Sequence, residues 1–174
     1  MNTLQRKITV PGTLEAVFDF FNRPENLEIL TPDSLKFNML TPSPVAMHNG
    51  AVFDYTIGLF GIPMRWTSVI ANYDPPHQFV DIQLKGPYAF WHHRHSFEAK
   101  PTGVEVTDEI HYEIGFSLLG KVLLRPLVQR QLESIFAFRA QAIDRLFRYP
   151  DASRRDHRAG ATLEDNSILL GEPN

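Results

Sequence analysis

The sequence of 174 residues contains no cysteine. This absence excludes disulfide bridges, thiolate nucleophiles and cysteine-based zinc sites, and it is compatible with a reducing compartment. No run approaches the roughly 20 apolar residues that a membrane-spanning helix needs. The first residues, MNTLQRKITVPG, lack the apolar core of a signal peptide. We therefore expect a soluble, cytoplasmic protein with no stable membrane insertion.

The sequence also lacks a large net charge, because its 17 Lys and Arg residues nearly balance its 20 Asp and Glu residues. This near balance provides no basic footprint, so we expect no nucleic-acid partner. The sequence lacks a serine-nucleophile motif, a glycine-rich phosphate loop, a paired-carboxylate glycosidase signature and a dinucleotide-binding fingerprint. We expect no cofactor, and any reaction would be proton transfer or cyclisation rather than covalent catalysis.

The most informative segment that is present is GPYAFWHHRHSF, residues 86–97. Side chains alternate across a strand, so Trp91, His93, His95 and Phe97 share one face. A face that combines large aromatic rings with imidazoles suits the wall of a mainly apolar pocket with a few polar anchor points. The segment favours a pocket for a small organic molecule more clearly than it favours any reaction.

The hydrophobic pattern predicts one strand, two short helices, six further strands and a long helix. Turns rich in proline and glycine join the six strands, which indicates an antiparallel meander. Pro126 is expected to interrupt or kink the long helix and to leave 118–125 as a separate turn or short helix. The expected strands are 3–10, 35–40, 51–57, 64–73, 78–84, 88–98 and 104–114, and the expected helices begin at Thr13 and Pro24 and span 118–147.

This order of elements resembles the SRPBCC superfamily, which includes the birch-pollen-allergen fold, START lipid-transfer domains and polyketide cyclases. The segments that carry the likeness are VPGTLEAVFDFFNRPENLEILTP, IPMRW, YDPPHQFVDIQLKGPYAFWHHRHSF, VTDEIHYEI and LESIFAFR. The resemblance implies an α+β helix-grip domain over residues 1–149, in which about seven antiparallel strands curve around the last helix and leave a hydrophobic cavity. Residues 150–174 are polar, and we expect them to form a flexible tail.

The 88–98 and 104–114 strands are expected to pair as a hairpin. If Phe97 lies near Val104, His93 lies near Asp108 on the cavity side, whereas a bulge at Gly103 would bring Glu109 opposite His93. An imidazole beside a carboxylate suits a general base, but such a pair is also a common structural link between strands. His93 and His95 could both reach one metal ion, but two histidines on a strand are a weak signal, and we expect no metal.

Several other side chains are candidates for the cavity wall, with ordinary core packing as the alternative. The long helix carries an apolar stripe of Val128, Leu132, Ile135, Phe138, Ala142 and Leu146. Arg139 falls near this stripe, where it could meet an acidic ligand group or form a salt bridge to the sheet. The full set of expected ligand-binding residues is Phe53, Tyr55, Trp66, Trp91, His93, His95, Asp108, Tyr112, Ile135 and Arg139.

The hairpin tip GLFGIP, residues 58–63, is unusually apolar for a turn. Leu59, Phe60 and Ile62 could cover the mouth of the cavity, form a homodimer contact, touch a membrane, or pack against a neighbouring helix.

The leading functional prediction is a carrier or sensor of a hydrophobic small molecule, such as a lipid, a polyketide or an aromatic metabolite. The first alternative is a cyclase or dehydratase that uses His93 with Asp108 as an acid–base pair and Tyr55 or Tyr112 as a hydrogen-bond donor. The second alternative is an interaction domain without a pocket.

Overall fold

We describe a computed structural model of the protein, which covers the backbone of residues 1–115 and 118–149 and the side chains of these ranges except 118–123. The tail expected at 150–174 therefore lies outside the described residues. Among the described helices, none is long and apolar enough to cross a membrane.

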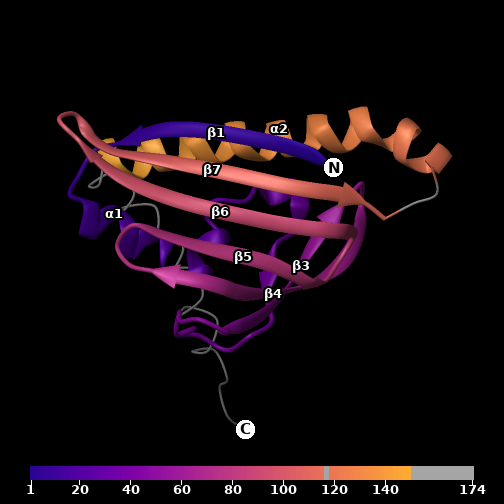
Figure 1. The fold of residues 1–174 in the computed structure, drawn as a ribbon, viewed down its shortest axis with the longest axis horizontal. Helices are drawn as coiled ribbons and strands as arrows, with labels where there is room; N and C mark the ends of the chain where they lie inside the picture. Colours follow the sequence, from indigo (N-terminus) through magenta and orange to yellow (C-terminus); the bar gives the residue numbers. More distant parts are fainter. Residues whose placement is uncertain (116–117, 150–174) are drawn as a thin grey trace, which may run out of the picture.

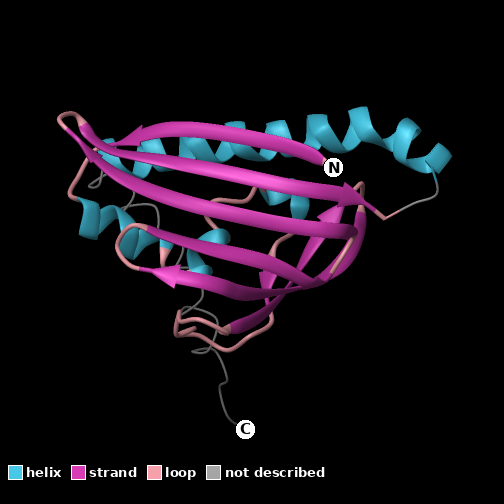
Figure 2. Cartoon of the chain, viewed as in Figure 1, coloured by secondary structure: helices cyan, strands magenta, loops and turns pink. Residues whose placement is uncertain are grey.

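Seven strands form one antiparallel sheet in the order β1-β7-β6-β5-β4-β3-β2. The long helix α2 runs beside the sheet, and the short helices lie on the same side of it (Figures 1 and 2). This arrangement confirms the predicted α+β helix-grip fold with a curved sheet and a long last helix. The elements are β1 (Asn2–Val10), α1 (Leu14–Phe21), η1 (Pro24–Leu27), η2 (Asp33–Leu35), β2 (Asn38–Met39), β3 (Val52–Leu59), β4 (Ile62–Asp74), β5 (Gln78–Lys85), β6 (Tyr88–Lys100), β7 (Gly103–Ile114) and α2 (Leu118–Arg148).

Helix α1 begins where its sequence predicts. The hydroxyl of Thr13 accepts a hydrogen bond from the backbone N–H of Ala16 and so satisfies one of the free donors of the first turn. The helix then buries Val17, Phe18 and Phe21.

Two expected elements differ from the structure. The strand expected at 35–40 is reduced to β2, because residues 33–35 form a 3-10 turn and Lys36 adopts a left-handed conformation with φ of 46°. The break expected at Pro126 is also wrong, since α2 continues through this residue. Pro126 is exposed, and the helix continues through it with one backbone hydrogen bond fewer.

The inward face of α2 differs in part from the predicted stripe. Val128 and Leu132 are buried as expected, and they are followed by Phe136 and Ile143. Phe138, which the prediction placed in the stripe, is 36% exposed. The observed spacing of four, four and seven residues keeps one helical face toward the sheet.

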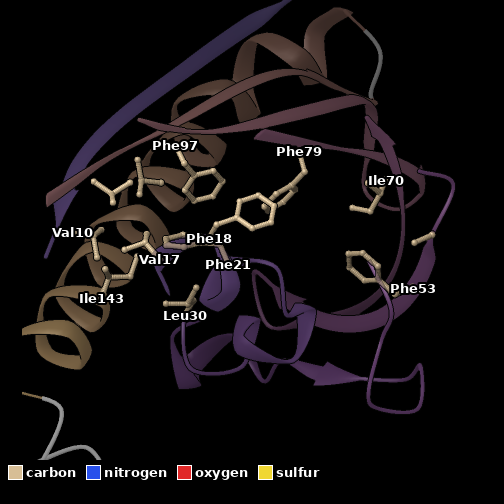
Figure 3. Close-up of a cluster of buried hydrophobic side chains, with 13 residues drawn as sticks. Val10, Val17, Phe18, Phe21, Leu30, Phe53, Ile70, Phe79, Phe97 and Ile143 are labelled. Atoms are coloured by element: carbon tan, nitrogen blue, oxygen red, sulfur yellow. The ribbon is translucent and has the colours of Figure 1, made fainter. Parts of the chain in front are cut away.

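The buried apolar side chains of the described residues form two clusters. The first, which we call the α1 cluster, joins α1 and Ile143 of α2 to the sheet. Within it the ring of Phe18 lies 6.2 Å from Phe79 and 5.3 Å from Phe97, measured between centroids (Figure 3). The second, which we call the tryptophan cluster, contains Trp66, Trp91, Tyr112 and the earlier part of the α2 face.

The turn of the β6–β7 hairpin lies one residue later in the chain than the predicted pairing of Phe97 with Val104 requires. Lys100 pairs with Gly103, so only two residues form the turn and Phe97 pairs with Val106. The predicted register is therefore wrong by two residues, and the one-residue shift considered as its alternative is also wrong. Because a shift of two residues preserves the face of every side chain, the inward residues of β6 and β7 still meet.

Gly103 fixes this turn. Its φ of +135° is a conformation that other residues rarely adopt, and a Cβ atom there would collide with the carbonyl oxygen of Val10. We predict that Gly103→Ala lowers the free energy of unfolding by about 1–3 kcal/mol, measured by chemical denaturation. Gly115→Ala is the matched control, because an added Cβ there meets nothing closer than 3.4 Å. Equal stability of the two variants would contradict this account of the turn.

Candidate functional site

A cavity of about 120 Å³ lies between the sheet, α2 and the segment from α1 to η1, and it is partly open to solvent. Both apolar clusters contribute to its wall, so it occupies the space where they meet. Its polar lining includes Ser68, Asp81, His93, His95 and Arg139, and its apolar lining includes Phe21, Leu30, Phe53, Tyr55, Ile57, Trp66, Ile70, Phe79, Tyr88, Trp91, Leu132, Ile135 and Phe136.

The structure brings most of the candidate ligand-binding residues to this cavity. Asp108 and Tyr112 are the exceptions, since they are buried but do not line it. Tyr112 instead packs in the tryptophan cluster, with its ring 5.8 Å from Tyr88. The candidates that do line the cavity are Phe53, Tyr55, Trp66, Trp91, His93, His95, Ile135 and Arg139.

The apolar tip of the β3–β4 hairpin is divided between two environments. Leu59 is buried and lines the cavity. Phe60 and Ile62 are 50% and 64% exposed and do not line it. They therefore project from the molecule beside the cavity wall, and their use as a cover or as a contact stays a prediction.

Four ionisable side chains meet in the sheet wall, and we call Asp81, His93, His95 and Asp108 the quartet. Asp108 Oδ1 lies 3.0 Å from His93 Nε2 and 2.8 Å from His95 Nδ1, and Asp81 Oδ2 lies 3.3 Å from His93 Nδ1 and 3.2 Å from His95 Nε2. The two imidazole rings are 3.8 Å apart between centroids. Each carboxylate thus approaches both imidazoles, although His95 Nδ1 is not aligned for a hydrogen bond.

Strand register explains why these four residues converge. Asp81 of β5 pairs with His93 of β6, and His95 of β6 pairs with Asp108 of β7. His93 and His95 are two residues apart and share the inward face, so both imidazoles fit between the two carboxylates. Glu109, the alternative partner considered for His93, instead pairs with Arg94 and forms an ion pair with it.

The quartet holds its carboxylates in the charged form. Burial raises the pKa of Asp81 and of Asp108, but attraction and hydrogen bonds from His93 and His95 outweigh burial and leave both pKa values well below the usual range. Burial lowers the pKa of His93, but the charge of Asp81 and the hydrogen bonds with both carboxylates outweigh it, and the net shift is upward.

The contacts within the quartet occupy the atoms with which its histidines would bind a metal ion. Asp81, His93 and His95 are the described residues that could hold a metal ion, because their ligand atoms lie within 4.8 Å of one another. The same atoms already face one another as donors and acceptors. Both nitrogens of each imidazole lie within 3.3 Å of a carboxylate oxygen, so a metal ion would have to displace at least one of these contacts.

Asp81 is the member of the quartet that the sequence analysis missed. In β5 the aliphatic residues Val80, Ile82 and Leu84 alternate with Phe79, Asp81 and Gln83, and the second set faces the cavity side. The signal that could have identified Asp81 is its two-residue spacing from Phe79, a large aromatic residue that the core buries.

No family model matches the sequence, and no curated protein matches it. Solved structures do match. TTHA0849 from Thermus thermophilus is 16% identical over 82% of this chain and 97% of that chain, with a TM-score of 0.64. A START superfamily protein from Mycobacterium smegmatis is 11% identical over 83% of this chain and 98% of that chain, with a TM-score of 0.61. The chain shares its fold with this START superfamily protein.

A plant protein extends this comparison. Ginseng major latex-like protein 151 from Panax ginseng is 12% identical over 84% of this chain and 97% of that chain, with a TM-score of 0.62. The START superfamily protein and the major latex-like protein are SRPBCC members, so the resemblance predicted from the sequence is confirmed at the level of the fold. At such low identity the likeness concerns the fold alone, and function depends on the site.

The quartet predicts the cost of removing one carboxylate. We expect Asp108→Ala to lower the free energy of unfolding by about 3–5 kcal/mol, because it leaves two buried imidazoles short of a partner. Glu109→Ala is the control, since its carboxylate lies on the outer face of the same strand and should matter much less. Chemical denaturation of both variants measures the difference. Similar losses in the two variants would show that the quartet contributes little.

The upward pKa shift of His93 predicts how stability depends on pH. A group whose folded-state pKa is raised stabilises the fold below its ordinary value, 6.5 for His93, and this contribution is lost as pH rises through the folded-state pKa. The carboxylates stay charged throughout this range. We therefore expect the free energy of unfolding to decrease from pH 6 to pH 8, measured by urea denaturation, together with an NMR titration of His93 above 6.5. Stability that is constant or increases over this range would contradict the shift.

Proposed function

We propose that the protein binds a small, mainly apolar molecule in the cavity between the sheet and α2, as a carrier or a sensor. The observation that carries this proposal is the cavity of about 120 Å³ with walls of aromatic and aliphatic side chains and a few polar groups. A concave apolar site with sparse polar anchors is the usual form of a small-molecule site. The fold shared with the START superfamily protein supports the same conclusion by analogy.

The size of the cavity limits the ligand. One water needs roughly 10–15 Å³ of such space, so the cavity of about 120 Å³ has room for a molecule of up to about a dozen non-hydrogen atoms. This volume favours a compact aromatic metabolite or a short single chain over a lipid with two acyl chains. Burial of about 200–300 Å² of apolar ligand surface would contribute about 5–7 kcal/mol before the costs of association.

The contacts of the quartet favour binding over the alternative of a cyclase or dehydratase. A general base needs a nitrogen within hydrogen-bond reach of the substrate proton. Both nitrogens of His93 lie within 3.3 Å of a carboxylate oxygen. A substrate would have to displace one of these contacts before His93 could accept its proton. The other alternative, a domain without a pocket, is disfavoured by the cavity itself.

The proposal predicts that a larger side chain on the cavity face of α2 prevents binding. Ile135 lines the cavity, whereas its neighbour Ser134 is exposed. We expect wild type to bind the neutral probe 2-naphthylmethanol, and Ile135→Trp to weaken binding at least about tenfold by filling the space. Ser134→Trp adds the same group outside the cavity and should leave affinity unchanged. Isothermal titration calorimetry gives the dissociation constants.

Native mass spectrometry of protein purified from its own host then identifies the natural ligand. If 2-naphthylmethanol does not bind, or if both tryptophan variants reduce its affinity equally, the cavity is not a binding site for compact apolar molecules.

A further inference from the structure

One cation lies within the otherwise apolar inward face of α2. Arg139 is only 9% exposed, and it lies between Phe136 of the tryptophan cluster and Ile143 of the α1 cluster. The neighbouring arginines Arg130 and Arg145 are exposed. A buried arginine in such a stripe normally has an anionic partner, because taking its charge out of water costs several kcal/mol.

No such partner is found among the described residues. No carboxylate of residues 1–115 or 124–149 lies within 4.0 Å of the Arg139 guanidinium, so the salt bridge to the sheet considered from the sequence is not seen there. Nε of Arg139 is buried and has no hydrogen-bond partner, and Cζ lies 4.8 Å above the ring centroid of Phe136. The guanidinium therefore lies over an aromatic ring beside the cavity, with Nε left unpaired.

The carboxylate of Asp81, which lines the cavity, already contacts other side chains. Asp81 is the only acidic residue among the described residues that line the cavity, and its Oδ2 contacts both imidazoles of the quartet. Arg139 lines the cavity together with a belt of polar groups from the adjacent strands β3, β4, β5 and β6, formed by Tyr55, Ser68, Asp81, His93 and His95. The polar end of a ligand would lie in this zone, and its apolar body would lie against the aromatic walls.

We propose that Arg139 binds a carboxylate on the ligand, which makes the ligand class a compact aromatic or short-chain organic acid. This inference rests on the proposed function. A carboxylate matches the planar fork of a guanidinium, which can donate two parallel hydrogen bonds to it. The contact with Phe136 holds the guanidinium in position for such an interaction.

A second arginine provides a competing place for the acid. Arg23 also lines the cavity, but it is exposed, so it marks the mouth rather than the interior. A charge at the mouth is solvated and contributes less to affinity than a buried one. An acid bound at Arg23 would leave the apolar walls near Arg139 partly uncovered. The two placements can be distinguished, because each predicts that a different arginine variant loses the preference for the acid.

Three probes with the same apolar body test the proposal: 2-naphthoate, 2-naphthylmethanol and 2-naphthylmethylamine. At pH 7.5 we expect wild type to bind the acid at least about tenfold more tightly than the alcohol, and the amine most weakly. Arg139→Gln should abolish the preference for the acid and change the affinity for the alcohol less than about threefold. Arg139→Lys should retain part of the preference, because it keeps the charge without the planar fork. Arg130→Gln is the matched control and should retain the preference in full, and Arg23→Gln should retain most of it.

The outcomes separate this inference from the proposed function. If wild type binds acid and alcohol equally, or if Arg23→Gln rather than Arg139→Gln removes the preference, the assignment to Arg139 is wrong while the binding function stands. If none of the three probes binds, the proposed function itself fails.

A stability measurement distinguishes a ligand-binding role of Arg139 from a structural one. A buried cation whose partner is a ligand lowers the free energy of unfolding of the ligand-free protein. Arg139→Met should therefore be as stable as wild type or more stable in urea denaturation. A clear loss of stability in Arg139→Met would show that Arg139 supports the fold, and would overturn the proposal.

Discussion

The contact between two carboxylates and two imidazoles inside the sheet is the constraint that organises this protein. His93, His95 and Asp108 are buried, and Asp81 is half-buried beside them, in a region otherwise built from aromatic and aliphatic groups. Each is tolerated only because the others are within about 3 Å. Removal of one member leaves its partners with an uncompensated buried charge, so the quartet joins the middle of β5, β6 and β7 through charge as well as through apolar packing.

The quartet also divides the interior. The α1 cluster lies on one side of it and the tryptophan cluster on the other, and α2 contacts both. Apolar side chains would close the space between two such clusters, but the polar belt and Arg139 cannot pack against one another in that way. The cavity occurs at this junction, with aromatic walls on both sides and the unpaired Nε of Arg139 on the helix.

Much of this structure could be predicted from the sequence, because strands and helix caps depend on neighbouring residues. The alternation of Trp91, His93 and His95 predicted which face of β6 turns inward, and Thr13 predicted the start of α1. Features that depend on distant partners were less accessible. The register of the β6–β7 hairpin depended on the position of its two-residue turn. Whether Asp81 joins the quartet depended on which face of β5 meets the core. That α2 continues through Pro126, which is exposed, could not be read from the proline itself.

The central position of β6 gives the quartet a consequence for folding. This strand is paired on both edges, with β5 and with β7. A slip of one residue between β5 and β6 would place Asp81 and the two imidazoles on opposite faces of the sheet, and the same slip between β6 and β7 would separate the imidazoles from Asp108. A slip between purely aliphatic strands would exchange one apolar contact for another. The quartet thus favours the native strand alignment, because a one-residue slip leaves a charged group without its partner.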